Sequence, residues 1–180
     1  GVAVVSDNKI QVRRVKGKIH DLEESLKSSP LEGVYGLGHT RWATHGRPSE
    51  ENAHPHRDCS GTLVVVHNGI IENYIPLKDE LIREGHVFRT ETDTEVIVHL
   101  IEKHFRGCLE EAVMAATREL QGAYAIAAMS VKDPGKIVAA KTGPPAVVGL
   151  GEGEFFISSD INPILGHTPR VVFLEDNEMA

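Results

Sequence analysis

The stretch GHTRWATHG, residues 38–46, places an arginine, a tryptophan, two threonines and two histidines in a glycine-bounded segment without helical or strand periodicity. Its first two residues end a predicted strand over residues 34–39, and the rest begins a loop that runs from Thr40 to Ser60. A loop of that length in a compact domain is usually functional or disordered. Because its side chains are rich in hydrogen-bonding groups, we interpret this loop as part of a site for a small polar molecule.

A second polar segment, His67-Asn68-Gly69, follows the apolar run Leu63–Val66, which predicts a buried strand over residues 62–67. One interpretation of Asn68-Gly69 is a tight turn, since this dipeptide is a strong turn signal. The alternative is an oxyanion site, in which the side-chain amide of Asn68 and the backbone N–H of Gly69 both donate hydrogen bonds. Glycine suits the second role because its backbone can approach a ligand closely.

The remaining pattern predicts an α+β fold with largely antiparallel sheets. Strands at residues 2–5 and 10–15 form a hairpin, and a short helix carries Leu22 and Leu26. Three amphipathic helices are predicted around residues 75–82, 96–105 and 109–120, the second behind a T-x-x-E capping box at Thr92–Glu95. Strands follow at residues 123–129, 136–140, 145–150, 154–158 and 170–174. Regular β-α-β alternation and the glycine-rich nucleotide-binding motifs are absent.

Composition excludes several classes of function. The 180 residues fit one domain, and 19 basic against 26 acidic residues give a net charge of −7, which argues against a nucleic-acid-binding surface. No apolar run approaches the ~20 residues of a membrane span. Two cysteines provide no disulfide framework and are typical of a reducing compartment, so we expect a cytoplasmic protein.

Three side chains are candidates for substrate binding, each with a structural alternative. Arg41 can hold a carboxylate through two parallel hydrogen bonds, or form a surface salt bridge. Trp42 is either a core residue or a lid over a ligand. Asp93 can bind a substrate ammonium, but an acid near a helix N-terminus is favoured by the helix dipole in any case, and the local sequence favours that structural explanation.

The histidines and cysteines are weaker candidates. His54-Pro55-His56 could place two imidazoles side by side, but the chain lacks H-E-x-x-H and any cysteine pair at ligand spacing, so we expect neither a metal nor a cofactor. The sequence context of Cys59 and of Cys108 identifies no positioned base, and we expect both thiols to be inert. The histidines that invite a metal interpretation are His39, His45, His54, His56 and His67.

Four motifs in order carry a resemblance to a known family: RWATHG (41–46), NAHPH (52–56), HNGIIEN (67–73) and TDTE (92–95). Together they resemble the glutaminase domain of the isomerising glutamine–fructose-6-phosphate aminotransferases, which are class II glutamine amidotransferases. The resemblance runs through the whole chain. Other class II amidotransferases share the Asn-Gly and the arginine but do not usually carry the sequence Trp-Ala-Thr-His that follows the arginine here.

The resemblance implies an Ntn-hydrolase-like four-layer αββα sandwich of two antiparallel sheets. It implies that Arg41 binds the α-carboxylate of L-glutamine and that Asp93 binds its α-amino group. It also implies that Asn68 and Gly69 form the oxyanion hole. Further substrate-binding residues implied by the resemblance, or retained as candidates from the loops, are Trp42, Thr44, His45, His54 and His67.

The family's nucleophile is a cysteine at the mature N-terminus, whereas residue 1 here is glycine. We therefore expect residues 1–180 to be a partial amidotransferase domain without the first strand and helix, without the sugar isomerase half, and inactive alone. The parent enzyme, expected to be a homodimer, would hydrolyse glutamine and pass ammonia to fructose 6-phosphate, giving glucosamine 6-phosphate. The alternatives are the glutaminase domain of another class II amidotransferase and a glutamine-binding module without catalysis.

Overall fold

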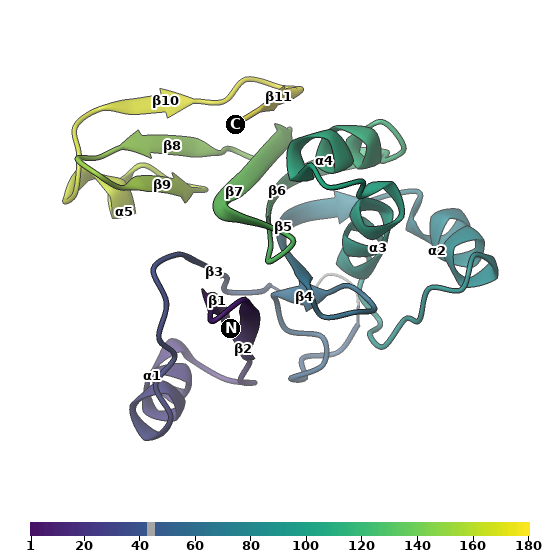
Figure 1. Cartoon of the computed structure of the whole chain (residues 1–180), viewed down its shortest axis with the longest axis horizontal. Coiled ribbons are helices and arrows are strands. Elements are labelled where there is room, and N and C mark those ends of the chain that lie inside the picture. The colour runs from purple at the N-terminus through teal and green to yellow at the C-terminus, as the bar shows by residue number, and fades with distance from the viewer. Residues whose placement is uncertain (43–45) are drawn as a thin grey trace.

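A computed structural model describes residues 1–42 and 46–180 and shows the layers of the molecule (Figure 1). The helices are α1 (Ile19–Ser28), α2 (Tyr74–Arg83), α3 (Thr94–His104), α4 (Leu109–Thr117) and α5 (Asn162–Leu165). The strands are β1 (Val2–Ser6), β2 (Lys9–Arg13), β3 (Gly36–Gly38), β4 (His56–Arg57), β5 (Leu63–Ile71), β6 (Gly122–Ser130), β7 (Asp133–Thr142), β8 (Val147–Leu150), β9 (Phe155–Ser158), β10 (Val171–Phe173) and β11 (Glu178–Met179).

A five-stranded antiparallel sheet in the order β11-β7-β6-β5-β4 forms the centre of the fold. The apolar run that begins β5 is buried on both faces, which explains why it does not alternate with polar residues. On one face, Val65 and Ile126 of the sheet pack with Ile97 and Ile101 of α3 and Val113 of α4. This helical face holds the first turn of α3 close to the end of β5.

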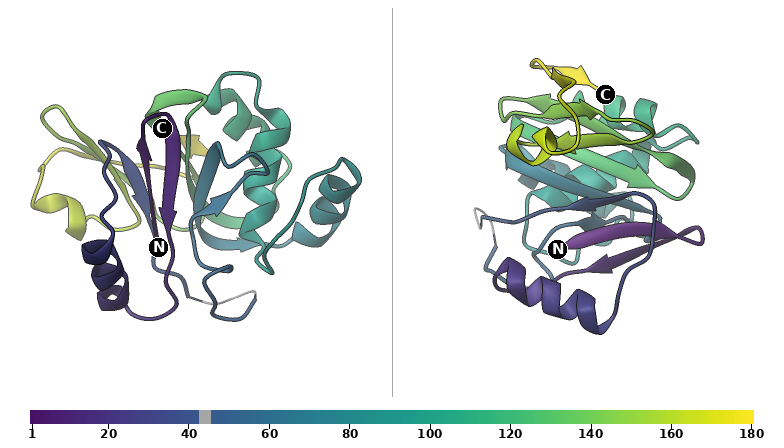
Figure 2. Two further views of the ribbon diagram at one scale, coloured as in Figure 1. Left: turned by 60° about the horizontal axis from the view of Figure 1, so that its bottom comes forward. Right: turned by 90° about the vertical axis from the view of Figure 1, so that its left-hand side faces the viewer.

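The other face of the central sheet packs against two smaller antiparallel sheets, ordered β2-β1-β3 and β10-β8-β9 (Figure 2). Ala3, Ile10 and Leu37 from the first of these lie in one apolar cluster with Val64 and Val66 of β5. Helix α1 has no buried residue, and the guanidinium of Arg13 in β2 holds it by donating to the backbone and hydroxyl oxygens of Ser25. The predicted α+β sandwich of antiparallel sheets is confirmed.

The main departure from the predicted elements concerns β5, which continues to Ile71 and pairs with β6 along its whole length. Asn68-Gly69 therefore lies inside a strand, and its interpretation as a turn is wrong. Strand β7 also begins earlier than the predicted strand at residues 136–140, because Asp133 already pairs with Ser130. Strands β4 and β11 and helix α5 were not predicted. Among the described residues, no helix is long and apolar enough to cross a membrane.

Candidate functional site

The predicted site residues meet at a cavity of about 230 Å³ between the segment after β3, the end of β5 and the start of α3. Each of these segments contributes polar side chains that were identified from the sequence. The residues around the cavity are His39, Thr40, Arg41, Trp42, His54, His67, Asn68, Gly69, Ile70, Asp93 and Thr94. The predicted substrate-binding residues Thr44 and His45 lie outside the described residues.

Arg41 brings a partly buried positive charge to this cavity. Its Nη2 donates a hydrogen bond to the backbone oxygen of Gly46 at 3.2 Å, which holds Gly46 beside the guanidinium. Burial lowers the pKa of Arg41, and the negative charge of Asp93 partly offsets that effect. The two side chains thus form a dipolar pair on one cavity, which suits a ligand that carries both a carboxylate and an ammonium.

Asp93 is 3% exposed, and its Oδ2 accepts a hydrogen bond from the backbone N–H of Ile71 at 2.8 Å. It occupies the N-cap position of α3 but makes no side-chain capping bond. The predicted capping box is wrong, because the carboxylate of Glu95 instead accepts from the backbone N–H groups of Arg89 and Thr90. Asp93 is therefore not an acid solvated at a helix end, and its position links β5 to α3 at the cavity.

Asn68 and Gly69 line the cavity, and two glycines beside Asn68 bring β5 and β6 close together while the pairing of the strands stays in register. Gly69 has φ +132°, and a Cβ added there would lie 2.0 Å from the backbone oxygen of Ala123. Gly122 on β6 has φ +119°, and its Cβ would lie 2.3 Å from the backbone oxygen of Ile70. Only glycine fits such a close approach of two strands, so this pair fixes the path of the backbone at Asn68.

Trp42 is 90% exposed, so the interpretation as a core residue is wrong. Its side chain borders the 230 Å³ cavity and a larger neighbouring one. An aromatic ring left in water at the mouth of a polar cavity is available to cover a bound ligand.

Four histidines cluster at the cavity: His39, His54 and His67 line it, and His56 lies beside His54. The rings of His39 and His54 stack with centroids 4.1 Å apart, and His54 meets His56 edge-on at 4.8 Å. His54 Nδ1 accepts a hydrogen bond from the backbone N–H of His67 at 3.2 Å, so His54 is neutral with its proton on Nε2. Within the described residues, none of these four belongs to a group with donor atoms close enough to hold a metal.

Burial lowers the pKa of His39 and His67 from 6.5 to about 4 and that of His56 to about 3, and it lowers the pKa of His54 well below its usual value. Asp93 opposes the shift at His67 but does not cancel it. In the unfolded chain the same imidazoles titrate near 6.5, so between pH 6.5 and 4 the unfolded state binds more protons.

We therefore expect the free energy of unfolding to fall by several kcal/mol between pH 7.5 and 5, because below pH 6.5 each such histidine contributes about 1.4 kcal/mol per pH unit. Urea unfolding at the two pH values measures the difference. His56→Gln should reduce the pH dependence, whereas His20→Gln should not, because the His20 side chain is 72% exposed. Equal stability at pH 7.5 and 5 would contradict the neutral buried cluster.

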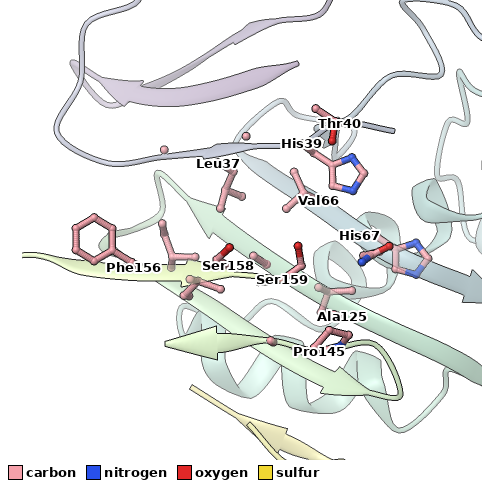
Figure 3. A pocket seen from close by; sticks show the side chains of 18 of the residues that line it. Leu37, His39, Thr40, Val66, His67, Ala125, Pro145, Phe156, Ser158 and Ser159 are labelled. Carbon is pink, nitrogen blue, oxygen red and sulfur yellow. The ribbon is translucent and has the colours of Figure 1, made fainter. Parts of the chain in front are cut away.

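A larger cavity of about 570 Å³ adjoins the first, and Figure 3 shows its two sides. Leu37 and Thr40 lie on the side of β3, and Phe156 and Ser158 lie on the side of β9, above β5 and β6. Strands β3 and β9 are both edge strands, so each turns one row of unpaired backbone groups toward this space.

Two positioning residues were missed from the sequence. The Asn52 side chain is buried, donates to the backbone oxygen of Arg47 at 3.0 Å, and accepts from the backbone N–H of Glu91 at 2.9 Å. Thr94 Oγ1 lies 2.9 Å from His67 Nδ1. Asn52 stands in a sequence motif, but its role depends on a contact between segments 39 residues apart, which local pattern does not reveal.

The chain is similar to known amidotransferases. A family model described as a glutamine amidotransferase domain matches residues 39–165. The glutamine–fructose-6-phosphate aminotransferase [isomerizing] of Methanothermobacter thermautotrophicus is 55% identical over 182 residues, which cover 100% of this chain and 31% of that protein. The same enzyme of Aquifex aeolicus is 52% identical over 180 residues, 100% of this chain and 30% of that protein. The chain thus spans about a third of the length of these relatives.

Solved structures show the same fold. The glutamine phosphoribosylpyrophosphate amidotransferase from B. subtilis, complexed with ADP and GMP, superposes with a TM-score of 0.82 at 26% identity. The match covers 99% of this chain and 39% of that one. The predicted Ntn-type amidotransferase fold is therefore confirmed.

Proposed function

The chain belongs to the glutamine amidotransferase domain family, and on that premise we propose that it binds L-glutamine in the 230 Å³ cavity and releases ammonia for transfer to fructose 6-phosphate. The observation that carries the proposal is the meeting of Arg41 and Asp93 on one cavity with Asn68 and Gly69. The sugar acceptor is supported by three relatives at 51–55% identity that are named as the fructose-6-phosphate enzyme.

In this proposal Arg41 holds the α-carboxylate of glutamine and Asp93 holds its α-ammonium. The paired charges orient the amino acid, so its side-chain amide extends toward the end of β5. Trp42 covers the ligand from the solvent side. Burial of Asp93 strengthens its attraction for a cation, because little water competes for the carboxylate.

The chemistry follows from where the amide would lie. A cysteine thiolate attacks the amide carbon, and the carbonyl oxygen becomes an oxyanion that accepts hydrogen bonds from the Asn68 side chain and the Gly69 N–H. The C–N bond then breaks, and the proton that the thiol lost passes through a general base to the departing nitrogen, which leaves as ammonia. Water then hydrolyses the γ-glutamyl thioester to glutamate and the free thiol.

Neither Cys59 nor Cys108 fits the role of nucleophile, because neither lines any of the three cavities around residues 39–42. We propose that another cysteine enters through the 570 Å³ cavity on a strand that pairs with the free edge of β3 or β9. Residues 1–180 alone should therefore bind glutamine without turning it over.

The choice of acceptor tests the proposed function. An aminotransferase that contains this chain should form glucosamine 6-phosphate from glutamine and fructose 6-phosphate, and should form no product with phosphoribosylpyrophosphate. Chromatography of the phosphorylated products measures both reactions. Transfer of ammonia to phosphoribosylpyrophosphate would instead assign the chain to the phosphoribosylpyrophosphate amidotransferases. That enzyme is the alternative to test because its structure superposes on this chain with a TM-score of 0.82.

A further inference from the structure

A second cluster of side chains that can bind a metal lies apart from the glutamine cavity. It is built on α3 and on the turn after β4, a strand that contacts α3 and is labelled with it in Figure 1. It joins Cys59 from that turn, His86 from the segment between α2 and α3, and His99 and Glu102 from α3 itself. One sulfur, two ring nitrogens and one carboxylate oxygen all lie within 4.8 Å of one another. We propose that these four side chains bind one zinc ion.

The distances suit a tetrahedral ion. Cys59 Sγ lies 3.8 Å from His86 Nδ1 and 3.7 Å from His99 Nδ1. With bonds of about 2.0–2.3 Å, neighbouring ligands of a tetrahedral zinc lie about 3.3–3.8 Å apart. Glu102 Oε2 lies closer, at 2.8 Å from His86 Nδ1 and 3.0 Å from His99 Nδ1. A shift of a few tenths of an ångström in this carboxylate therefore opens the centre for the ion.

The donor set is typical of zinc, which binds thiolate, imidazole and carboxylate ligands together. Hard cations such as Mg²⁺ prefer an all-oxygen shell, which this cluster lacks. With four protein ligands, no position remains for a reacting water, so the site is structural rather than catalytic.

The surroundings already hold the ligands in place. The backbone N–H of Cys59 donates to Glu102 Oε1 at 3.1 Å, which leaves Oε2 to face the cluster. The backbone N–H of Val87 donates to the Cys59 sulfur at 3.3 Å. His99 is 1% exposed, and its Nε2 lies 3.7 Å from Glu95 Oε1. A metal on Nδ1 would put the proton on Nε2, facing this carboxylate, which is the usual outer-sphere partner of a zinc-bound histidine.

The other cysteine provides a contrast. Cys108, Glu110 and Asp133 also lie within 4.8 Å of one another, but Lys136 forms ion pairs with both carboxylates, at 2.9 and 3.1 Å. A lysine ammonium thus already neutralises that group. Within residues 1–42 and 46–180, Glu102 forms ion pairs with His86 and His99 but none with lysine or arginine.

The ion would act as a brace for the substrate site without taking part in it. It would tie the turn at Cys59 and the segment at His86 to α3. The first turn of α3 carries Thr94, and Asp93 directly precedes it, so the brace would fix the helix that presents the cavity's acid. The proposal differs from the absence of a metal expected from the sequence, and it does not depend on the proposed function.

Metal titration of the chelator-treated 180-residue chain tests the proposal. We expect one equivalent of Zn²⁺ to bind and to raise the unfolding temperature by about 4 °C or more. Co²⁺ in its place should give the strong visible bands of a tetrahedral ion and a thiolate-to-cobalt charge-transfer band. Cys59→Ser should abolish the charge-transfer band and weaken Zn²⁺ binding at least about 100-fold.

Cys108→Ser is the matched control and should bind Zn²⁺ and Co²⁺ as the unsubstituted chain does. His86→Gln removes a second ligand, whose side chain is 13% exposed, and should weaken Zn²⁺ binding even if Cys59→Ser does not fold. Failure to bind an equivalent of Zn²⁺, a charge-transfer band that survives Cys59→Ser, or its loss in Cys108→Ser would each overturn the assignment. None of these outcomes decides the proposed function, because the test of that proposal measures the products of ammonia transfer.

Discussion

Arg41→Ala, made in an aminotransferase that contains this chain, should raise the KM for glutamine about 100-fold and change kcat by less than about tenfold. Two charge-assisted hydrogen bonds to the α-carboxylate are lost, and a loss of about 3 kcal/mol corresponds to roughly a hundredfold in binding. The carboxylate does not change during the reaction, so the lost interaction is the same in the ground state and the transition state. Steady-state kinetics of glutamate release measure both constants.

A substrate analogue shows whether the effect comes from the carboxylate. 4-Aminobutanamide is glutamine without its α-carboxylate, and it should be a poor substrate of the unsubstituted enzyme and an equally poor one of Arg41→Ala. Arg83→Ala is the control, because Arg83 is an exposed residue of α2 and its side chain bonds within its own helix. If Arg41→Ala still prefers glutamine to the analogue by 100-fold, the carboxylate is bound elsewhere.

Gly69→Ala should destabilise the 180-residue chain by about 3 kcal/mol or more, enough to reduce its folded yield. Two costs add at this position. The backbone has φ +132°, which side-chain-bearing residues rarely adopt, and the new Cβ would lie 2.0 Å from the backbone oxygen of Ala123. This clash is relieved only if β5 and β6 separate at the point where Asn68 faces the cavity. Urea unfolding, or yield of soluble protein, measures the effect.

Gly85→Ala separates these two costs. Gly85 also has a positive φ, of +98°, but a Cβ added there would meet no atom within 4 Å. Its substitution should therefore cost about 1–2 kcal/mol, from backbone strain alone. Equal losses in the two variants would show that contact between β5 and β6 at Gly69 is not tight.

The sequence predicts the order and type of most elements because their patterns are local. The helices α2, α3 and α4 each show an apolar face, and the β1–β2 hairpin has a polar connection whose Asp7 and Asn8 adopt positive φ. The extent of β5 was not predicted. Asn68-Gly69 is a turn signal in isolation, but β6 continues to pair beyond it, and that pairing joins Asn68 to Ala125, far along the chain.

The residues of the candidate site also differ in whether local sequence is enough to identify them. Arg41 was identified by its neighbours in the sequence, and it lies on the cavity. Asp93 resembles an ordinary helix-end acid in local sequence, and only burial and the bond from Ile71 distinguish it. A search of the sequence for the spacing of metal ligands does not find the Cys59 cluster, because its members come from three segments that only the tertiary fold brings together.

The central claim is that Arg41 and Asp93 together hold the amino-acid head of glutamine. The most direct measurement is a crystal structure, with L-glutamate bound, of the aminotransferase that contains this chain. We predict that the α-carboxylate forms paired hydrogen bonds with the Arg41 guanidinium and that the α-ammonium lies against the Asp93 carboxylate, with the side chain directed to Asn68. An amino acid bound in another cavity, or bound here without contact to Arg41 and Asp93, would contradict the account.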